Sequence, residues 1–280
     1  RVARYPRDIG RESANRRVAQ RSVLPNFLII GAAKSGTTSL YEQLRRHPDV
    51  CMPPRRWKEP TFFSEHARGR WARGLDWYCS LFSHHRGEAA VGEASTSYTK
   101  APYYGDAADK IASVLPAARL IYLVRDGLRL PFDRALDEKP FLVETARYAF
   151  QLAPYRRRFP RDRILVVPFE RFVTDPVAEC KRICRFLDID DRLDLALDRP
   201  RNVGSARRLV RGIHWPRAYR AFKRHAPRAV SRAFDHWMTR PLPRPSRDSQ
   251  AARRLRDRLL PEVDALEQDW GIDFRRWWRC

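Results

Sequence analysis

The apolar positions of this chain include two continuous runs. Phe27 to Ala32 and Leu120 to Val124 carry no charged residue, a pattern typical of strands that are buried on both faces of a parallel sheet. After the first run, Leu40 and Leu44 fall on one stripe of a helix predicted over Thr37 to Arg46. A strand that leads through a short loop into a helix is the repeating unit of α/β proteins.

The same alternation continues along the chain. A last helix is predicted over residues 250–270, because Leu255, Leu259, Val263 and Leu266 form an apolar stripe that should dock on the core. We therefore expect a P-loop-like, three-layer α/β fold with a central parallel sheet flanked by helices. The other expected elements are strands at 50–52, 89–92 and 163–167, helices at 74–82, 106–115 and 141–158, and a helix that begins at Asp175-Pro176.

The pattern divides the chain into three parts. Residues 1–24 form a basic N-terminal arm, and residues 25–200 hold the α/β core. Residues 201–280 comprise a basic loop and a C-terminal helical segment, which we expect to pack on the same domain. The sequence assigns no role to the Arg-rich stretch 207–233 in this last part.

The loop from Gly31 to Thr37 is the first candidate site. Glycine and hydroxyl residues at a strand-to-helix junction leave backbone N–H groups free to bind an anion. Gly31 and Gly36 have the spacing of G-x-x-x-x-G-K-[ST], but Thr37 stands in the lysine position and Lys34 lies three residues earlier. The alternative interpretation is a plain turn and helix cap.

The charge of the chain points to anionic partners. Its 56 basic and 33 acidic residues give a formal charge of +23. Such a field favours nucleotides, acidic sugars, an anionic membrane face or nucleic acid.

The cysteines and the apolar runs bear on the compartment. The five cysteines show no C-x-x-C spacing, so buried thiols in a reducing compartment are favoured over metal ligands or disulfides. The sequence has no apolar run long enough to span a bilayer, and it opens without a signal-type stretch. We expect a cytoplasmic protein, or one of the Golgi lumen if an N-terminal anchor has been removed.

Five further segments follow the loop in a fixed order: Lys-Glu-Pro-Thr-Phe-Phe at 58–63, Gly-Glu-Ala-Ser-Thr-Ser-Tyr at 92–98, Arg125-Asp126, residues 159–170, and Asp175-Pro176. Together with the Lys34 loop they resemble the sulfotransferases that use 3′-phosphoadenosine 5′-phosphosulfate, in particular the carbohydrate and heparan sulfate branch. The resemblance covers roughly residues 25 to 190.

The resemblance implies a role for each matching residue. Lys34 would lie at the oxygen that bridges sulfate and phosphate, and Arg125 would bind the 3′-phosphate. Glu59 would be the catalytic base, beside Lys58, with Glu93 as the rival base. The residues expected to bind the 5′-phosphate are Ser35, Gly36, Thr37, Thr38 and Ser39, and a second contact to the 3′-phosphoadenosine is expected from Ser205 and Arg207. No metal ion is expected.

A simpler interpretation remains open for several of these residues. Arg125 could end its strand in a surface ion pair, Lys58-Glu59 could be a solvated charge pair, and residues 202–208 could be a plain basic loop. The family pattern also places a serine after Arg-Asp, where this chain has Asp133. Either a segment after Gly127 is deleted or the printed chain omits it, and we favour the second.

The sequence thus predicts an enzyme that moves a sulfuryl group from 3′-phosphoadenosine 5′-phosphosulfate to a hydroxyl, in preference to an amine, of a carbohydrate or glycoconjugate. The acceptor could be acidic or lipid-linked, and peripheral contact with an anionic membrane is compatible with the charge. No specific nucleic-acid partner is expected. The alternatives are a P-loop kinase or nucleotidase and a basic protein that binds polyanions or membrane surfaces.

Overall fold

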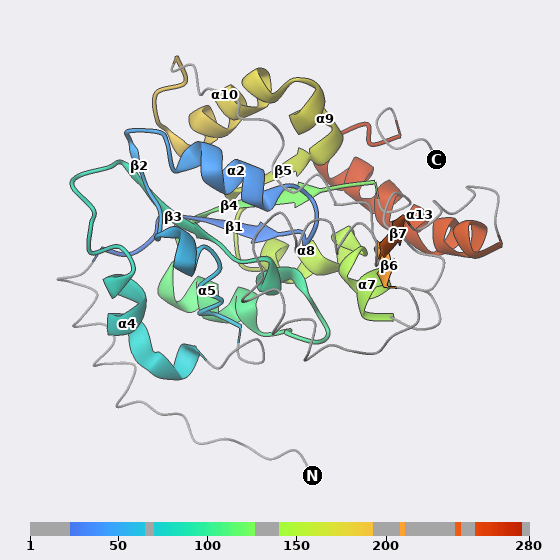
Figure 1. The fold of residues 1–280 in the computed structure, drawn as a ribbon, viewed down its shortest axis with the longest axis horizontal. Coiled ribbons are helices and arrows are strands. Elements are labelled where there is room, and N and C mark those ends of the chain that lie inside the picture. Colours follow the sequence, from blue (N-terminus) through green and yellow to red (C-terminus); the bar gives the residue numbers. More distant parts are fainter. Residues whose placement is uncertain are drawn as a thin grey trace, which may run out of the picture.

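A parallel five-stranded sheet forms the centre of the computed structural model, which describes residues 23–64, 70–126, 140–192, 208–210, 239–241 and 250–275 (Figure 1). The strand order is β2-β3-β1-β4-β5, and each neighbouring pair in the sheet is parallel. The strands are β1 (Phe27–Gly31), β2 (Val50–Cys51), β3 (Ala90–Ala94), β4 (Arg119–Val124) and β5 (Ile164–Pro168). The predicted α/β fold with a central parallel sheet is confirmed.

Helices cover both faces of this sheet (Figure 1). One face carries α2 (Thr37–Leu44), α9 (Phe169–Thr174) and α10 (Pro176–Leu187), and the other carries α4 (Gly74–Ser80), α5 (Ala107–Val114), α7 (Pro140–Thr145) and α8 (Tyr148–Arg156). Short 3-10 helices are η1 (Arg55–Trp57), η2 (Trp71–Arg73), η3 (Thr96–Thr99) and η5 (Arg161–Arg163). The long helix α13 (Gln250–Trp270) and the antiparallel pair β6 (Arg208–Val210) and β7 (Thr239–Pro241) complete the described elements.

The continuous apolar strands supply two cores, because successive side chains of a strand point to opposite faces. In β1, Leu28 and Ile30 pack with α5 and α8, whereas Phe27 and Ile29 pack against α2 and α10. All four side chains are fully buried. The absence of a polar position in this run therefore follows from the helices on both sides.

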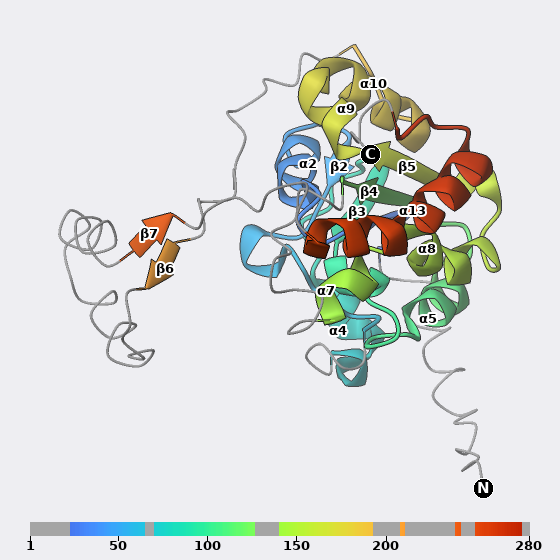
Figure 2. The same cartoon turned by 90° about the vertical axis from the view of Figure 1, so that its right-hand side faces the viewer.

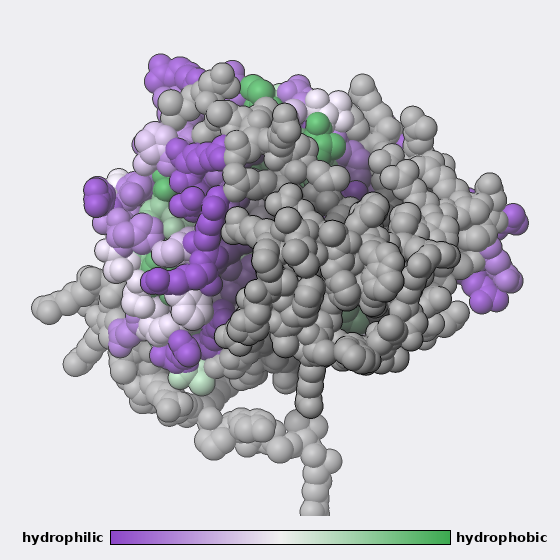
Figure 3. Space-filling model, viewed as in Figure 1, coloured by the Kyte–Doolittle hydropathy of each residue, from purple (hydrophilic) through white to green (hydrophobic). Residues whose placement is uncertain are grey.

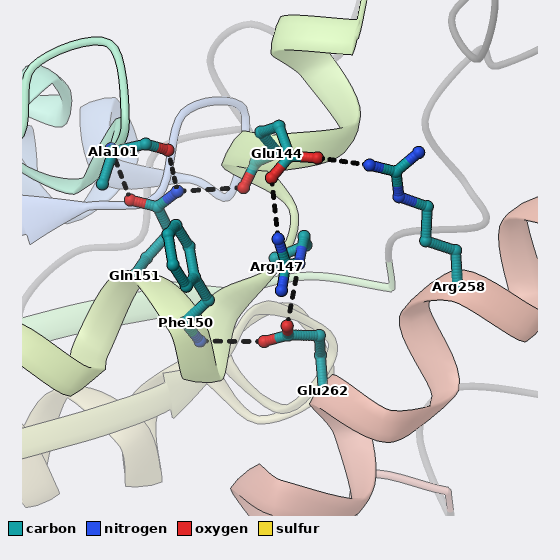
Figure 4. A network of polar contacts seen from close by, with 7 residues as sticks. All are labelled: Ala101, Glu144, Arg147, Phe150, Gln151, Arg258 and Glu262. Carbon is teal, nitrogen blue, oxygen red and sulfur yellow. Dashed lines mark hydrogen bonds and ion pairs between the residues drawn. The ribbon is translucent and has the colours of Figure 1, made fainter.

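The C-terminal helix docks as its apolar stripe predicts. Leu255, Leu259, Val263 and Leu266 are all buried. Figure 2 shows α13 lying against α7 and α8. Ion pairs at this interface join Arg147 to Glu262 at 3.0 Å and Arg258 to Glu144 at 2.5 Å (Figure 4). The helix is thus fixed to the core by apolar packing and by charge pairs that link it to α7 and to the start of α8.

Two differences from the predicted bounds bear on the later argument. The single helix expected at 141–158 is broken between Thr145 and Tyr148, where Arg147 leaves helical geometry and binds Glu144 and Glu262. The strand expected at 89–92 extends to Ala94 and therefore includes Glu93. The predicted helix start at Asp175 is confirmed, because its side chain accepts a hydrogen bond from the Ala178 N–H at 3.0 Å.

The described surface is mostly hydrophilic on the face seen in Figure 3, with small hydrophobic spots over α9 and α10. Val173 and Val177 are among the few large apolar side chains exposed there. Within the described ranges, no helix combines the length and the apolar character needed to cross a bilayer. Four cysteines, at 51, 79, 180 and 184, are buried free thiols, as predicted.

Candidate active site

The Lys34 loop connects β1 to α2 at the carboxyl edge of the sheet. Gly36 caps α2 with a left-handed backbone (φ 90°), and no side chain caps the helix in its place. The N–H groups of Ser39 and Leu40 bond back to the Gly36 carbonyl, at 2.9 and 3.1 Å. The turn before them therefore presents an uncapped helix N-terminus, which favours an anion.

The hydroxyl groups of this loop are not equally accessible. Ser35 and Thr37 are buried, at 1% and 4% exposure, whereas Thr38 and Ser39 are half-buried and Lys34 is exposed. Ser35 lies beside Tyr148, whose pKa burial raises to about 12 although the Ser35 hydroxyl lowers it. Of the five residues predicted to bind the 5′-phosphate, Thr38 and Ser39 are the ones that offer accessible hydroxyl groups.

Arg125 follows β4 and reaches the Lys34 loop. Its Nη1 donates to the Lys34 carbonyl at 3.3 Å, and its guanidinium lies 4.5 Å from the centre of the Phe169 ring. Its Nε is buried and has no hydrogen-bond partner among the described residues. The next residue, Asp126, donates its N–H to Glu170 at 3.0 Å, which fixes the strand end. Two segments that the sequence placed at one sheet edge are thus in direct contact.

Glu59 lies beyond η1 and is held against the end of β3. Its carboxylate accepts hydrogen bonds from Thr96 Oγ1 and from Lys58 Nζ, each at 3.1 Å. Thr96 begins η3, two residues after β3 ends. The Glu59 side chain keeps 39% of its surface exposed. Its carboxylate is therefore both oriented and accessible, as a general base requires.

Arg70 holds the backbone under Glu59, a contact that sequence reasoning missed. Its Nη1 donates to the carbonyl groups of Glu59, at 3.0 Å, and of Pro60, at 2.5 Å. The guanidinium also lies 4.9 Å from the centre of the Trp57 ring. A basic residue eleven positions from its partner has no periodic relation to it, so only the folded structure reveals the pair.

Glu93, the rival base, lies in the interior. It is completely buried, and its Oε1 accepts hydrogen bonds from the hydroxyl groups of Tyr98 and Tyr78, at 2.5 and 3.4 Å. Burial raises the pKa of its carboxyl to about 7. Because none of its surface is exposed, an acceptor cannot contact it in this conformation. The geometry favours Glu59 over Glu93 as the base.

The comparisons with known proteins find sulfotransferases. The sequence model of the sulfotransferase family matches residues 67–192, which include Glu93 and Arg125. Heparan sulfate glucosamine 3-O-sulfotransferase 6 of Homo sapiens is 33% identical over 189 residues, which cover 59% of this chain and 52% of that protein. Heparan sulfate glucosamine 3-O-sulfotransferase 3A1 of Mus musculus is 29% identical over 194 residues, which cover 59% of this chain and 46% of that protein. These matches relate residues 67–192 of the chain to the sulfotransferase family.

Solved structures of sulfotransferases share the fold. A sulfotransferase from Alicyclobacillus acidocaldarius superposes with a TM-score of 0.59 at 24% identity, covering 91% of this chain and 99% of that one. The sulfotransferase domain of the Synechococcus PCC 7002 olefin synthase gives 0.51 at 21% identity, covering 84% and 94%. At these identities the likeness concerns the fold alone. This chain spans about half the length of the mouse and human sulfotransferases above.

Two predicted site residues, Ser205 and Arg207, lie outside the described part of the chain. The segment after Asp126, in which Gly127 and Asp133 fall, lies outside it as well. Within the described ranges, no group of three or more His, Cys, Asp or Glu side chains is arranged to hold a metal ion. The described site therefore consists of the Lys34 loop, Arg125, and Glu59 with its supporting residues.

Proposed function

We propose that this protein transfers a sulfuryl group from 3′-phosphoadenosine 5′-phosphosulfate to a hydroxyl group of a carbohydrate or glycoconjugate. The observation that carries the proposal is the contact of Arg125 with the Lys34 carbonyl, 91 residues away in sequence. This contact gathers two cations at an uncapped helix N-terminus, on the sheet edge where Glu59 is also exposed. The names of the relatives, which act on heparan sulfate glucosamine, support a carbohydrate acceptor.

The residues present fit the nucleotide donor. The turn before Ser39 has no side-chain cap, and the Nε of Arg125 is buried without a partner among the described residues. Leaving these N–H donors without an acceptor costs the folded protein free energy, which an anionic ligand would offset. When bound, the nucleotide supplies an activated sulfate whose sulfur the acceptor oxygen attacks.

Each residue then has a distinct task. Lys34 neutralises the charge that develops on the leaving oxygen, which lowers the barrier to transfer. The first turn of α2, with Thr38 and Ser39, holds the 5′-phosphate, and Arg125 holds the 3′-phosphate through its guanidinium fork. Ser205 and Arg207 remain the predicted second contact to the 3′-phosphoadenosine.

Glu59 takes the proton from the acceptor hydroxyl as the new bond forms. Thr96 and Lys58 keep its carboxylate oriented, each through a hydrogen bond of 3.1 Å. The formal charge of +23 suits an acidic acceptor and a peripheral contact with an anionic membrane. The buried free thiols suit a reducing compartment, in keeping with the predicted cytoplasmic location.

A thermal-shift comparison tests the nucleotide preference. Adenosine 3′,5′-bisphosphate should stabilise the protein without magnesium, by about 2.7 kcal/mol at a hundredfold excess over its dissociation constant. ATP, which lacks the 3′-phosphate that Arg125 should bind, should stabilise it less, with or without magnesium. Labelled sulfate should then appear on a heparan-type oligosaccharide. Equal or better stabilisation by Mg-ATP would instead support the kinase or nucleotidase alternative.

A further inference from the structure

Thr61, which follows the Glu59-Pro60 pair, has a left-handed backbone with φ 54°. A β-branched residue rarely adopts this conformation. The Thr61 side chain is 7% exposed, and its Oγ1 has no hydrogen-bond partner among the described residues. The side chain therefore gains no bond there that would offset the strain. Such a conformation persists only where the surrounding structure imposes it, and it is common at functional sites.

The peptide group between Pro60 and Thr61 is bonded at both of its polar atoms. The Thr61 N–H donates to Ser95 Oγ at 2.9 Å, and the Pro60 carbonyl accepts from Arg70 at 2.5 Å. Ser95 is completely buried. Loss of its hydroxyl would leave the Thr61 N–H buried without an acceptor, which costs more than the hydrogen bond itself contributes. Two side chains, Ser95 and Arg70, thus hold the backbone that follows Glu59.

Ser95 is also fixed to the central sheet. Its own N–H donates to the Ile29 carbonyl of β1 at 3.0 Å, and β1 runs on into the Lys34 loop. The next residue, Thr96, donates to the Glu59 carboxylate at 3.1 Å. Ser95 therefore bonds the strand of the nucleotide loop through its backbone and the segment of the base through its side chain.

A second serine makes a contact of the same kind at a different place. Ser97 is 3% exposed, and its Oγ accepts a hydrogen bond from Ser64 Oγ at 2.8 Å. This bond joins the same two segments of the chain as the bond of Ser95. It engages a side chain, however, and does not involve the peptide groups next to Glu59. Ser95 and Ser97 are thus a matched pair of buried hydroxyl groups.

We propose that Ser95 is a positioning residue. Its hydroxyl holds Thr61 in the left-handed conformation, which sets the position of the Glu59 carboxylate relative to the loop that binds the nucleotide. This inference rests on the proposed function, in which Glu59 takes the proton of the acceptor hydroxyl. A base displaced by about 1 Å can slow a reaction roughly 10²-fold. Because Ser95 is buried and touches neither ligand, its loss should lower the rate and leave the affinities unchanged.

The kinetic test compares Ser95→Ala with its control Ser97→Ala. Both variants should have a lower urea midpoint, since each loses a buried hydrogen bond. Ser95→Ala should also lower kcat for transfer of labelled sulfate to a heparan-type oligosaccharide by about tenfold to 10²-fold. Its KM for the nucleotide and its affinity for adenosine 3′,5′-bisphosphate should not change. Ser97→Ala should keep the kcat of the wild type.

A double variant tests whether strain at Thr61 is what Ser95 opposes. Ser95→Ala/Thr61→Gly should recover part of the lost kcat, because glycine adopts a positive φ without strain. A wild-type kcat in Ser95→Ala would overturn the inference. An equal loss in Ser97→Ala, or no recovery in the double variant, would overturn it as well.

Hydrogen exchange separates this inference from the proposed function, because it requires no acceptor. By nuclear magnetic resonance, the Thr61 N–H of Ser95→Ala should exchange about tenfold faster than in the wild type, relative to the N–H groups of β1. Ser97→Ala should leave this ratio unchanged. If the wild type transfers no sulfate while the Thr61 N–H depends on Ser95, the inference holds and the proposed function fails. Unchanged exchange in Ser95→Ala would overturn the inference whatever the activity.

Discussion

Substituting Gly36 by alanine tests whether the Lys34 loop and the Arg125 site form one unit. At this residue φ is 90°, and an added Cβ would lie 2.7 and 2.8 Å from two carbons of the Phe169 ring. A left-handed backbone costs an alanine about 1–2 kcal/mol. The overpacked ring adds about 1–3 kcal/mol, because Phe169 must move. We therefore expect Gly36→Ala to lower the free energy of unfolding by about 2–5 kcal/mol.

The displacement of Phe169 should also weaken nucleotide binding. The Arg125 guanidinium lies 4.5 Å from the centre of that ring, so moving the ring removes its support. Affinity for adenosine 3′,5′-bisphosphate should fall about tenfold or more, since the loss of an aromatic contact and of loop geometry together amounts to about 1.4 kcal/mol or more. Urea unfolding and calorimetry with the nucleotide measure the two effects separately.

Two further variants separate strain from crowding. Gly271→Ala places an alanine at φ 63° with nothing within 4 Å of the new Cβ, so it should show the backbone cost alone. The double variant Gly36→Ala/Phe169→Leu should recover part of the stability, because the smaller side chain leaves room for the Cβ. If Gly36→Ala costs no more than Gly271→Ala, the contact with Phe169 is not what makes a glycine necessary here.

Three other outcomes are expected. Glu59→Gln should keep its nucleotide affinity and lose turnover by a factor of about 10² or more. If this variant turned over as fast as the wild type, Glu59 would not be the base. Lys34→Ala should weaken nucleotide binding and also slow transfer, so a variant that loses only one of the two would contradict its double role. The pKa of Glu93, about 7 in the fold, exceeds its ordinary value, so wild-type stability should fall as the pH rises from about 4.5 to 7. The free energy of unfolding of the wild type should fall by roughly 3 kcal/mol more than that of Glu93→Gln. Urea unfolding at pH 5 and 8 measures this difference, and parallel stability curves for the two proteins would refute it.

The fold could be predicted because two of its strands are apolar along their length. β1 and β4 are buried on both faces, so each shows as an apolar run without interruption. The stripe of α13 is equally plain, since all four of its predicted core leucine and valine positions are buried. The break between α7 and α8 could not be predicted from the sequence. It depends on the hydrogen bonds of Arg147 to Glu144 and to Glu262, which lies in a helix far along the chain. Periodicity in one segment carries no information about such a partner.

The site divides in the same way between what local rules predict and what tertiary contacts decide. The carboxyl edge of a parallel sheet collects the residues that follow its strands, so Lys34 and Arg125 could be placed together in advance. The resemblance ranks Glu59 over Glu93 as the predicted base, although both lie in matched segments. Exposure supports this ranking: Glu93 is completely buried and accepts hydrogen bonds from two tyrosine hydroxyl groups, whereas the Glu59 side chain keeps 39% of its surface exposed.

Arg70 escaped sequence reasoning for one physical reason: in a chain with 56 basic residues, no single arginine or lysine stands out. What distinguishes it is a fixed set of partners, since its guanidinium donates to the backbone carbonyl groups of Glu59 and Pro60 and lies 4.9 Å from the centre of the Trp57 ring. It reaches Glu59 from a segment that shares no motif with it. A charged side chain that the fold takes partly out of water must be compensated by a partner, and the folded structure alone shows which partner that is.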